Sequence, residues 1–222
     1  MTPAQFARMI DHTQLRAYAT QIDIAELCGE AQQYGFAAVT VNPAWTSYCA
    51  KRLAGSGVGI DAVVGFPLGA TTAHVKVEEA HDAVRCGATE IDMVINVGAL
   101  KSGFPEFVER EIGAIVKAVR GIPVKVILET GYLTAREKVS VCKMCVRCGA
   151  AYVKTSTGYG NTGATVEDVA LLRRIVGNEL GVKAAGGIRT YADVMAMVDA
   201  GATRIGTSSA VPIMESMRNE SR

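Results

Sequence analysis

Four times along the chain, a helical stretch ends at a glycine and a short apolar run follows at once. The glycines are Gly35, Gly87, Gly149 and Gly201, in the segments QYGFAAVTV, RCGATEIDMVI, RCGAAYVKTST and DAGATRIGTSS. Glycine ends a helix readily because it adopts a positive φ without steric cost. The pattern predicts the helix-to-strand half of a strand–helix–strand unit, and the intervals of 52, 62 and 52 residues each suit about two such units.

Expected helix starts and strands continue this alternation. A threonine three residues before a carboxylate indicates a capped helix start. The four such pairs are Thr20/Asp23, Thr134/Glu137, Thr165/Asp168 and Thr190/Asp193. Short apolar runs predict strands near residues 9–13, 37–42, 59–65, 90–95, 123–129, 151–156, 181–185 and 203–207.

Eight strands that alternate with helices predict an α/β protein, a single (β/α)8 TIM barrel with a short N-terminal helix. A doubly wound open sheet is the alternative, and it is disfavoured because no GxGxxG turn follows the first expected strand. A length of 222 residues suits one barrel, and no linker or low-complexity tract divides the chain. We therefore expect residues 1–222 to form a single domain.

The charge balance and cysteine content limit the classes of partner. The net charge is +1, so the chain has no basic field for nucleic acid or an anionic membrane. No targeting signal and no run of about 18 apolar residues is visible. The six cysteines are expected to be reduced thiols. We expect a cytoplasmic protein that acts on small molecules and forms a homo-oligomer, a dimer or tetramer, through an exposed apolar barrel face.

Charged residues interrupt four of the apolar runs. Lys125, Lys154 and Lys183 stand in VKVILET, YVKTST and GVKAAGG, and Asp92 stands in EIDMVIN. Asp92 and Lys154 both lie five residues after a repeat glycine, which predicts similar depths in the barrel. Buried charges are costly unless they are paired or used in chemistry. Structural ion pairs are one explanation, but three lysines on consecutive strands with a carboxylate in reach favour an active site.

The chemistry that suits this cluster is amine catalysis. A lysine that attacks a carbonyl has to be neutral, although its ordinary pKa is about 10.4. Burial and a neighbouring ammonium group both lower that pKa. Lys154 and Lys183 form such a pair, in which one activates the other for Schiff-base formation, while Asp92 would relay protons. The spacing leaves open which lysine is the nucleophile.

Two later segments are rich in glycine and hydroxyl groups. AAGGIR (184–189) follows the seventh expected strand, and IGTSS (205–209) follows the eighth. In such barrels, the loops after the last two strands often bind phosphate together with a helix N-terminus. Ser208 and Ser209 precede a final expected helix, and the Thr157–Gly158 turn would close the same pocket. Ordinary tight turns are the alternative, but two such loops on these strands favour a phosphate site.

Two motifs, VKTSTGYG (153–160) and VKAAGGIRT (182–190), form a highly specific pair at this separation. Other segments carry the same signal: IDHT (10–13), LCGEAQQYGFAAVTVNP (27–43), VVGFPLGATT (63–72), GATEIDMVINVGALKSG (87–103), VKVILETGYLT (124–134), GATVEDV (163–169) and GATRIGTSS (201–209). Along nearly its whole length, the chain resembles the bacterial-type class I deoxyribose-phosphate aldolases.

The resemblance implies reversible cleavage of 2-deoxyribose 5-phosphate to glyceraldehyde 3-phosphate and acetaldehyde in deoxyribonucleotide catabolism, with no metal or other cofactor. It implies that Lys154 forms the Schiff base, that Lys183 lowers its pKa and exchanges protons, and that Asp92 relays protons. Asp11 and Lys125 are implied to line the site and support it electrostatically. The implied phosphate-site positions are Gly158, Gly186, Gly187, Ile188, Arg189, Gly206, Ser208 and Ser209.

Three features depart from the family pattern. Tyr159 stands where some members carry a lysine and others an aromatic residue, and Thr40 stands where cysteine is frequent. The final segment, MRNESR, has no C-terminal tyrosine of the kind that some members fold over the substrate. These departures bear on substrate affinity and tolerance rather than on the type of reaction.

Two other functions and two metal sites are the alternatives. A sugar-phosphate isomerase would use the same phosphate-binding loops without forming a Schiff base on a lysine. A non-catalytic sugar-phosphate binder would have only the binding pocket. An iron–sulfur site at Cys142, Cys145 and Cys148 is disfavoured, because their spacing suits helix packing and a fourth ligand is missing. A zinc-dependent aldolase is disfavoured because the three histidines show no HExxH or HxH spacing.

Overall fold

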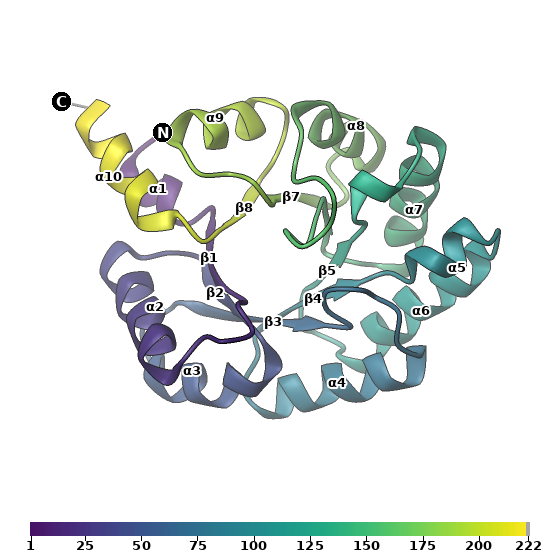
Figure 1. Ribbon diagram of the computed structural model, residues 1–222, viewed down its shortest axis with the longest axis horizontal. Helices are drawn as coiled ribbons and strands as arrows, with labels where there is room; N and C mark the ends of the chain where they lie inside the picture. Colours follow the sequence, from purple (N-terminus) through teal and green to yellow (C-terminus); the bar gives the residue numbers. More distant parts are fainter. Residues whose placement is uncertain (221–222) are drawn as a thin grey trace.

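Eight parallel strands close into a barrel in the computed structural model, which describes residues 1–220 (Figure 1). Each strand pairs with the next along the chain, and β8 pairs with β1 to complete the ring. The strands are β1 (Ile10–Gln14), β2 (Ala38–Val41), β3 (Gly59–Val64), β4 (Glu90–Val94), β5 (Val124–Ile127), β6 (Tyr152–Lys154), β7 (Gly181–Ala185) and β8 (Arg204–Thr207). The predicted barrel is confirmed, and pairing of β1 with β8 excludes an open sheet.

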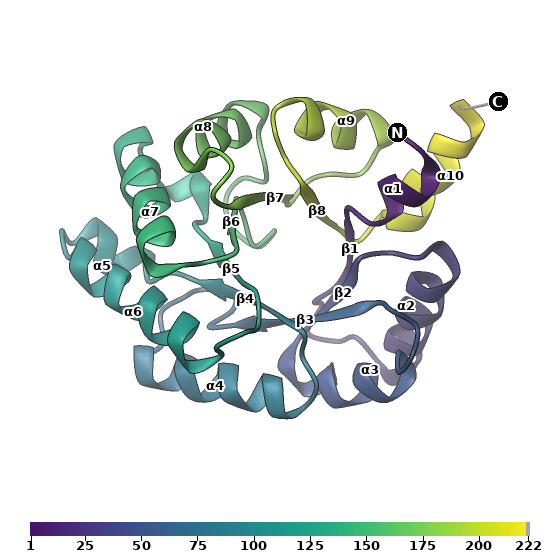
Figure 2. The same ribbon diagram turned by 180° about the vertical axis from the view of Figure 1, so that it is seen from behind.

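Helices surround the strands, as Figures 1 and 2 show from opposite sides. They are α1 (Pro3–Ala7), α2 (Gln21–Tyr34), α3 (Thr46–Arg52), α4 (Ala73–Arg85), α5 (Val97–Lys101), α6 (Pro105–Ala118), α7 (Ala135–Cys148), α8 (Val166–Val176), α9 (Tyr191–Asp199) and α10 (Ala210–Glu220), with 3-10 turns at Pro43–Trp45 and Thr130–Tyr132. The short N-terminal helix is α1, which packs beside α10. Among these described helices, none is long and apolar enough to cross a membrane.

The helix ends follow the predicted chemistry. Gly35 and Gly149 cap α2 and α7 with φ of 71° and 72°, in the left-handed region that glycine tolerates. Capping boxes at Thr20, Thr134 and Thr190 are complete, with hydrogen bonds in both directions. For Thr165, the hydroxyl accepts the N–H of Asp168. The longer middle interval between repeat glycines contains a pair of helices, α5 and α6, between β4 and β5.

Alternation along each strand separates a charged interior from an apolar exterior. Ile91 and Met93, which flank Asp92, belong to the hydrophobic core, as do Val124 and Val126 around Lys125. Successive side chains of a strand point to opposite faces, so the apolar neighbours pack under the helices while the charged residues point into the barrel. The barrel therefore holds these charges in its interior.

Candidate active site

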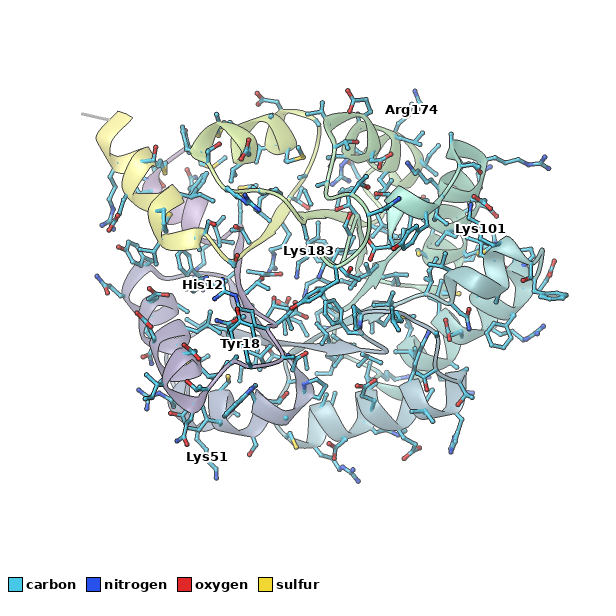
Figure 3. The ribbon with its side chains drawn as sticks, viewed as in Figure 1. His12, Tyr18, Lys51, Lys101, Arg174 and Lys183 are labelled. Carbon is cyan, nitrogen blue, oxygen red and sulfur yellow. The ribbon has the colours of Figure 1, made fainter. Side chains whose placement is uncertain are left out.

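Eight charged side chains from seven of the strands meet inside the barrel. Four are carboxylates and four are cations: Asp11, Asp61, Glu90, Asp92, Lys125, Lys154, Lys183 and Arg204. Figure 3 places Lys183 near the middle of the barrel. All three lysines and Asp92, which the sequence singled out, belong to this cluster.

Lys183 lies at the centre of the carboxylates. Its Nζ is 2.6 Å from Asp11 Oδ2, 2.8 Å from Asp61 Oδ2 and 2.8 Å from Asp92 Oδ2. Burial by itself would lower the pKa of Lys183, but the three carboxylates outweigh it and raise the pKa above its ordinary value. Lys183 is therefore a permanent ammonium group at neutral pH.

Lys154 has the opposite character. It is paired in register with Lys183 on the next strand, and its Nζ lies 2.6 Å from Asp92 Oδ2. Burial lowers the pKa of Lys154, the Lys183 ammonium lowers it further, and Asp92 opposes both effects. Burial is thus the larger cause of activation, and the neighbouring lysine adds to it. Lys154 is the only one of the three lysines whose pKa is lowered.

Asp92 joins the lysines together. Its Oδ2 contacts both Lys154 and Lys183, and its Oδ1 lies 3.1 Å from Lys125 Nζ. Burial would raise the pKa of Asp92, yet the three ammonium groups hold it well below its ordinary value. The carboxylate oxygen that touches Lys154 is therefore placed to accept or return a proton at the reacting nitrogen.

The resemblance implied that Asp11 and Lys125 line the site. Both are wholly buried beneath the pocket, and neither is among the residues that line it. Asp11 Oδ1 accepts a hydrogen bond from Arg204 at 2.7 Å. Lys125 Nζ is 2.6 Å from Glu90 Oε2, and nearby carboxylates overcome its burial and raise its pKa. Both residues are at the inner end of the cluster, where they act through charge rather than by contact with a ligand.

Asp61 escaped the sequence reasoning. It is wholly buried, accepts a hydrogen bond from the Thr40 hydroxyl at 2.9 Å, and contacts Lys125 at 3.0 Å. The signal was present, because Asp61 interrupts the apolar run GIDAVV just as Asp92 interrupts EIDMVI. Glu90 and Arg204 were missed because each stands at the first residue of a strand, where charge is unremarkable.

A pocket of about 240 Å³ opens above this cluster. Lys154 lines it together with most of the expected phosphate positions: Thr157, Gly158, Gly186, Gly187, Ile188, Arg189, Gly206 and Ser208. Ser209 is not among the lining residues. It lies just before α10, where its N–H donates to Thr207 Oγ1 at 3.0 Å. Lys154 and the glycine loops therefore share one cavity, as the sequence predicted.

The glycines of the pocket are required by the backbone. Gly158, Gly186 and Gly187 have φ of 85°, 90° and 81°, which side chains rarely tolerate. A Cβ at Gly163 would lie 2.2 Å from the Gly186 carbonyl oxygen. The loop after β6 and the loop after β7 thus touch backbone to backbone. Backbone N–H groups of glycine-rich loops such as these are suited to binding an anion.

Gly206 has a different function in the pocket. A Cβ there would lie 3.1 Å from Lys183 Cε and 3.1 Å from Ala185 Cβ. The missing side chain leaves room for Lys183 to cross from β7 to the carboxylates.

Glu129 is a further residue that sequence reasoning missed. It is the one non-glycine residue with positive φ, 55°, within residues 1–220. Its buried carboxylate accepts hydrogen bonds from both the hydroxyl and the N–H of Thr157. Burial raises the pKa of Glu129 despite these donors. Glu129 therefore fixes the orientation of Thr157, which lines the pocket.

Tyr159 borders the pocket entrance. Its hydroxyl donates to the Leu15 carbonyl at 2.8 Å, and its ring meets Phe66 edge-on with 5.5 Å between centroids. The side chain is therefore tethered across the loops after β1, β3 and β6 rather than aimed at an anion. Some family members carry a lysine at this position. In this chain the Tyr159 side chain packs against neighbouring loops instead.

The remaining sequence candidates lie elsewhere. Cys142 and Cys145 are buried in the apolar core under α7, as predicted for helix packing. Within residues 1–220, no group of three or more histidine, cysteine, aspartate or glutamate side chains is arranged to hold a metal ion.

Comparison with known proteins gives one consistent family. The sequence model described as DeoC/LacD family aldolase matches residues 6–211. The chain is 54% identical to the deoxyribose-phosphate aldolase of Thermococcus gammatolerans over 223 residues, which cover 99% of each chain. It is 55% identical to that of a Geobacillus strain, over 94% of each chain.

A solved structure agrees with these relatives. The tetrameric deoxyribose phosphate aldolase from Aeropyrum pernix superposes with a TM-score of 0.92 at 38% identity, covering 99% of this chain and 93% of that one. Fold, sequence and the buried lysine pair lead to the same assignment, and this chain belongs to the DeoC/LacD aldolase family.

Proposed function

We propose that this protein is a 2-deoxy-D-ribose 5-phosphate aldolase that works through a Schiff base on Lys154. The observation that carries the proposal is that Lys154, the one lysine of the charged cluster with a lowered pKa, lines the same pocket as the glycine loops. The activity of close relatives supports the substrate, since the two most similar sequences cited above are deoxyribose-phosphate aldolases.

In the cleavage direction, the neutral Lys154 amine attacks the aldehyde carbon of the open-chain sugar. Water leaves, and a protonated imine remains. Removal of the proton from the C3 hydroxyl lets the C2–C3 bond break, and its electron pair moves toward the imine to form an enamine. Glyceraldehyde 3-phosphate departs. Protonation of the enamine at C2 and hydrolysis release acetaldehyde and regenerate Lys154.

The neighbouring groups have separate tasks in these steps. Lys183 stays an ammonium group, so it keeps the pKa of Lys154 low and stabilises negative charge that develops beside it. Asp92 Oδ2, 2.6 Å from Lys154 Nζ, is the oxygen nearest the reacting nitrogen and exchanges protons with it. Asp11 and Lys125 balance the charge beneath them.

The phosphate of the substrate would occupy the glycine-lined part of the pocket. The loops after β7 and β8 supply Gly186, Gly187 and Ser208, and Arg189 adds a cation at the rim. An anchored phosphate limits how far the aldehyde carbon can lie from Lys154, which favours attack by positioning the reactants.

The cellular setting is part of the same proposal. Residues 1–222 act as one barrel domain in the cytoplasm, in the breakdown of deoxyribonucleotides. The protein assembles as a homo-oligomer, a dimer or a tetramer, which the tetrameric Aeropyrum pernix relative supports. Sugar phosphate and small aldehydes are its partners, rather than nucleic acid or membrane.

Borohydride trapping tests the covalent step. Reduction in the presence of acetaldehyde, followed by peptide mass analysis, is expected to leave an ethyl group on Lys154. An enzyme that cleaves deoxyribose 5-phosphate with no adduct on any lysine would contradict the Schiff base. A sugar-phosphate isomerase or a non-catalytic sugar-phosphate binder would neither cleave deoxyribose 5-phosphate nor form a lysine adduct.

A further inference from the structure

The charged cluster inside the barrel is balanced only while Lys154 is protonated. Four cations and four carboxylates then cancel. The proposed reaction needs neutral Lys154, and the loss of that proton to solvent would leave three cations against four carboxylates. An uncompensated charge is costly in a group of side chains this buried. A proton retained on one of the carboxylates would remove that cost.

The four carboxylates differ in how many cations hold them ionised. Asp92 contacts three ammonium groups, and Asp11 contacts three cations, Lys183, Arg204 and, at 3.8 Å, Lys125. Asp61 contacts Lys183 and Lys125, and its remaining partner is the neutral Thr40 hydroxyl. Glu90 contacts Lys125 and Arg204, but its side chain is 16% exposed and keeps contact with water.

Asp61 is thus wholly enclosed and faces only two cations. Its neighbours on every packed strand are Asp11 on β1, Thr40 on β2, Glu90 and Asp92 on β4, Lys125 on β5 and Lys183 on β7. Burial and the Asp92 charge raise the pKa of Asp61 to about 6, whereas the pKa values of Asp11 and Asp92 are lowered.

A continuous hydrogen-bonded path joins Lys154 to Asp61. Lys154 Nζ donates to Asp92 Oδ2 at 2.6 Å, and Lys183 Nζ donates to the same oxygen at 2.8 Å. Lys183 Nζ also donates to Asp61 Oδ2 at 2.8 Å. Each link is of ordinary hydrogen-bond length, and no link needs a side chain to move.

We propose that Asp61 stores the proton that Lys154 gives up and returns it when the Schiff base forms. This inference rests on the proposed function. Lys154 passes a proton to Asp92, and as Lys183 releases one of its protons to Asp61 it receives one from Asp92, so Lys183 remains an ammonium group. The net change is a neutral Lys154 and a protonated Asp61, with Asp92 and Lys183 as before.

The stored proton is then consumed by the chemistry. Lys154 Nζ bonds to the aldehyde carbon, and the carbon–oxygen bond of the resulting carbinolamine breaks as its oxygen leaves as water. That departure takes up one proton, which returns from Asp61 along the same path. The product is a positively charged imine beside an ionised Asp61, so four cations again face four carboxylates. The cluster is therefore neutral in the resting enzyme, with the neutral Lys154 amine, and in the imine.

Proton uptake during imine formation tests this storage. Acetaldehyde alone is added to the enzyme in weak buffer near neutral pH, and a pH indicator follows the solution. The wild-type enzyme is expected to take up no net proton, because the one it needs is already bound. Asp61→Asn removes the store and, by removing a negative charge, lowers the pKa of Lys154 further. This variant is expected to take up one proton per trapped site.

Either of two results would overturn the proposal. One is uptake of a proton by the wild-type enzyme for each imine formed, a measurement that stands even if Asp61→Asn does not fold. The other is imine formation without proton uptake in Asp61→Asn.

Two controls accompany the experiment. Borohydride trapping counts the imine in each sample, so absence of any imine in the wild-type enzyme would refute the aldolase function and not the storage. Glu111→Gln removes a buried carboxylate that pairs with Lys76 outside the cluster. It is expected to behave as the wild-type enzyme.

Discussion

Two buried lysines, Lys76 and Lys154, look alike in their surroundings and differ in their use. Lys76 is 0% exposed and Lys154 is 3% exposed, and burial lowers the pKa of both. Each has a carboxylate close by, Glu111 at 2.7 Å from Lys76 and Asp92 at 2.6 Å from Lys154. Burial with a partner carboxylate is therefore not sufficient to make a lysine catalytic.

The difference lies in what else each lysine meets. Lys76 Nζ also donates to the Val94 carbonyl at 2.8 Å, and its chain lies against Gly65, where a Cβ would be 2.7 Å from Lys76 Cε. Glu111 also accepts the N–H of Asn96, so the pair ties α4 and α6 to the end of β4. Lys154 instead has a cavity above it and a second ammonium group, Lys183, beside it. Access to a cavity and a neighbouring cation therefore distinguish Lys154, the proposed Schiff-base lysine, from Lys76.

Replacing each lysine by methionine gives the strongest test of this comparison. Lys154→Met removes the nucleophile, so kcat is expected to fall by at least about 10³-fold while circular dichroism stays that of the folded protein. Steady-state cleavage of deoxyribose 5-phosphate measures the loss. Turnover near the wild-type rate would remove Lys154 from the mechanism.

Lys76→Met is expected to affect stability instead of chemistry. It leaves Glu111 buried without its cation, which costs about 3–5 kcal/mol of unfolding free energy when one partner of a buried pair is removed. Chemical denaturation measures this change. The folded fraction is expected to keep wild-type kcat, and a specific loss of kcat would break the distinction between the two lysines.

Lys183→Leu sharpens the comparison by removing the feature that Lys76 lacks. The Lys183 ammonium lowers the pKa of Lys154, so without it the pKa of Lys154 rises and the acid limb of kcat/KM moves to higher pH. A pH–rate profile measures the shift. A uniform loss of activity at every pH, with no movement of the limb, would mean that Lys183 acts only in packing.

Ser208→Asp tests the cavity, the other feature that Lys76 lacks. Ser208 is exposed at the rim, and a carboxylate there would repel a bound phosphate. KM for deoxyribose 5-phosphate is expected to rise about tenfold, with little change for unphosphorylated deoxyribose. Equal changes in KM for both sugars would argue against a phosphate at this end of the pocket.

The barrel could be predicted from the sequence because its signals are local. Gly35 and Gly149 end helices by a conformation that depends only on the glycine itself, and Thr134 caps a helix through a carboxylate three residues away. Lys154 and Asp92 stood out because each breaks an apolar run. The same rule applied to Asp61 would have found it.

Other residues carried no local signal. Lys76 lies in an ordinary amphipathic helix, AHVKVEE, and only the packing of α4 against α6 shows that it is buried. From the sequence, Glu129 is an ordinary residue at the end of an expected strand. Its positive φ and its hydrogen bonds with Thr157 depend on the position of the loop after β6. Such residues are defined by contacts between distant segments, which periodicity does not encode.

The eight strands, the lysines inside them and the glycine loops could be predicted because each depends on residues a few positions apart. Which cations contact the same carboxylate depends instead on the folded barrel. Lys154 and Asp92 are 62 residues apart, and Lys183 and Asp61 are 122 apart. Barrel closure brings them within hydrogen-bond distance, and the pKa of each group is then set by the burial and charges around it. The order of protonation in the cluster is therefore a property of the closed barrel.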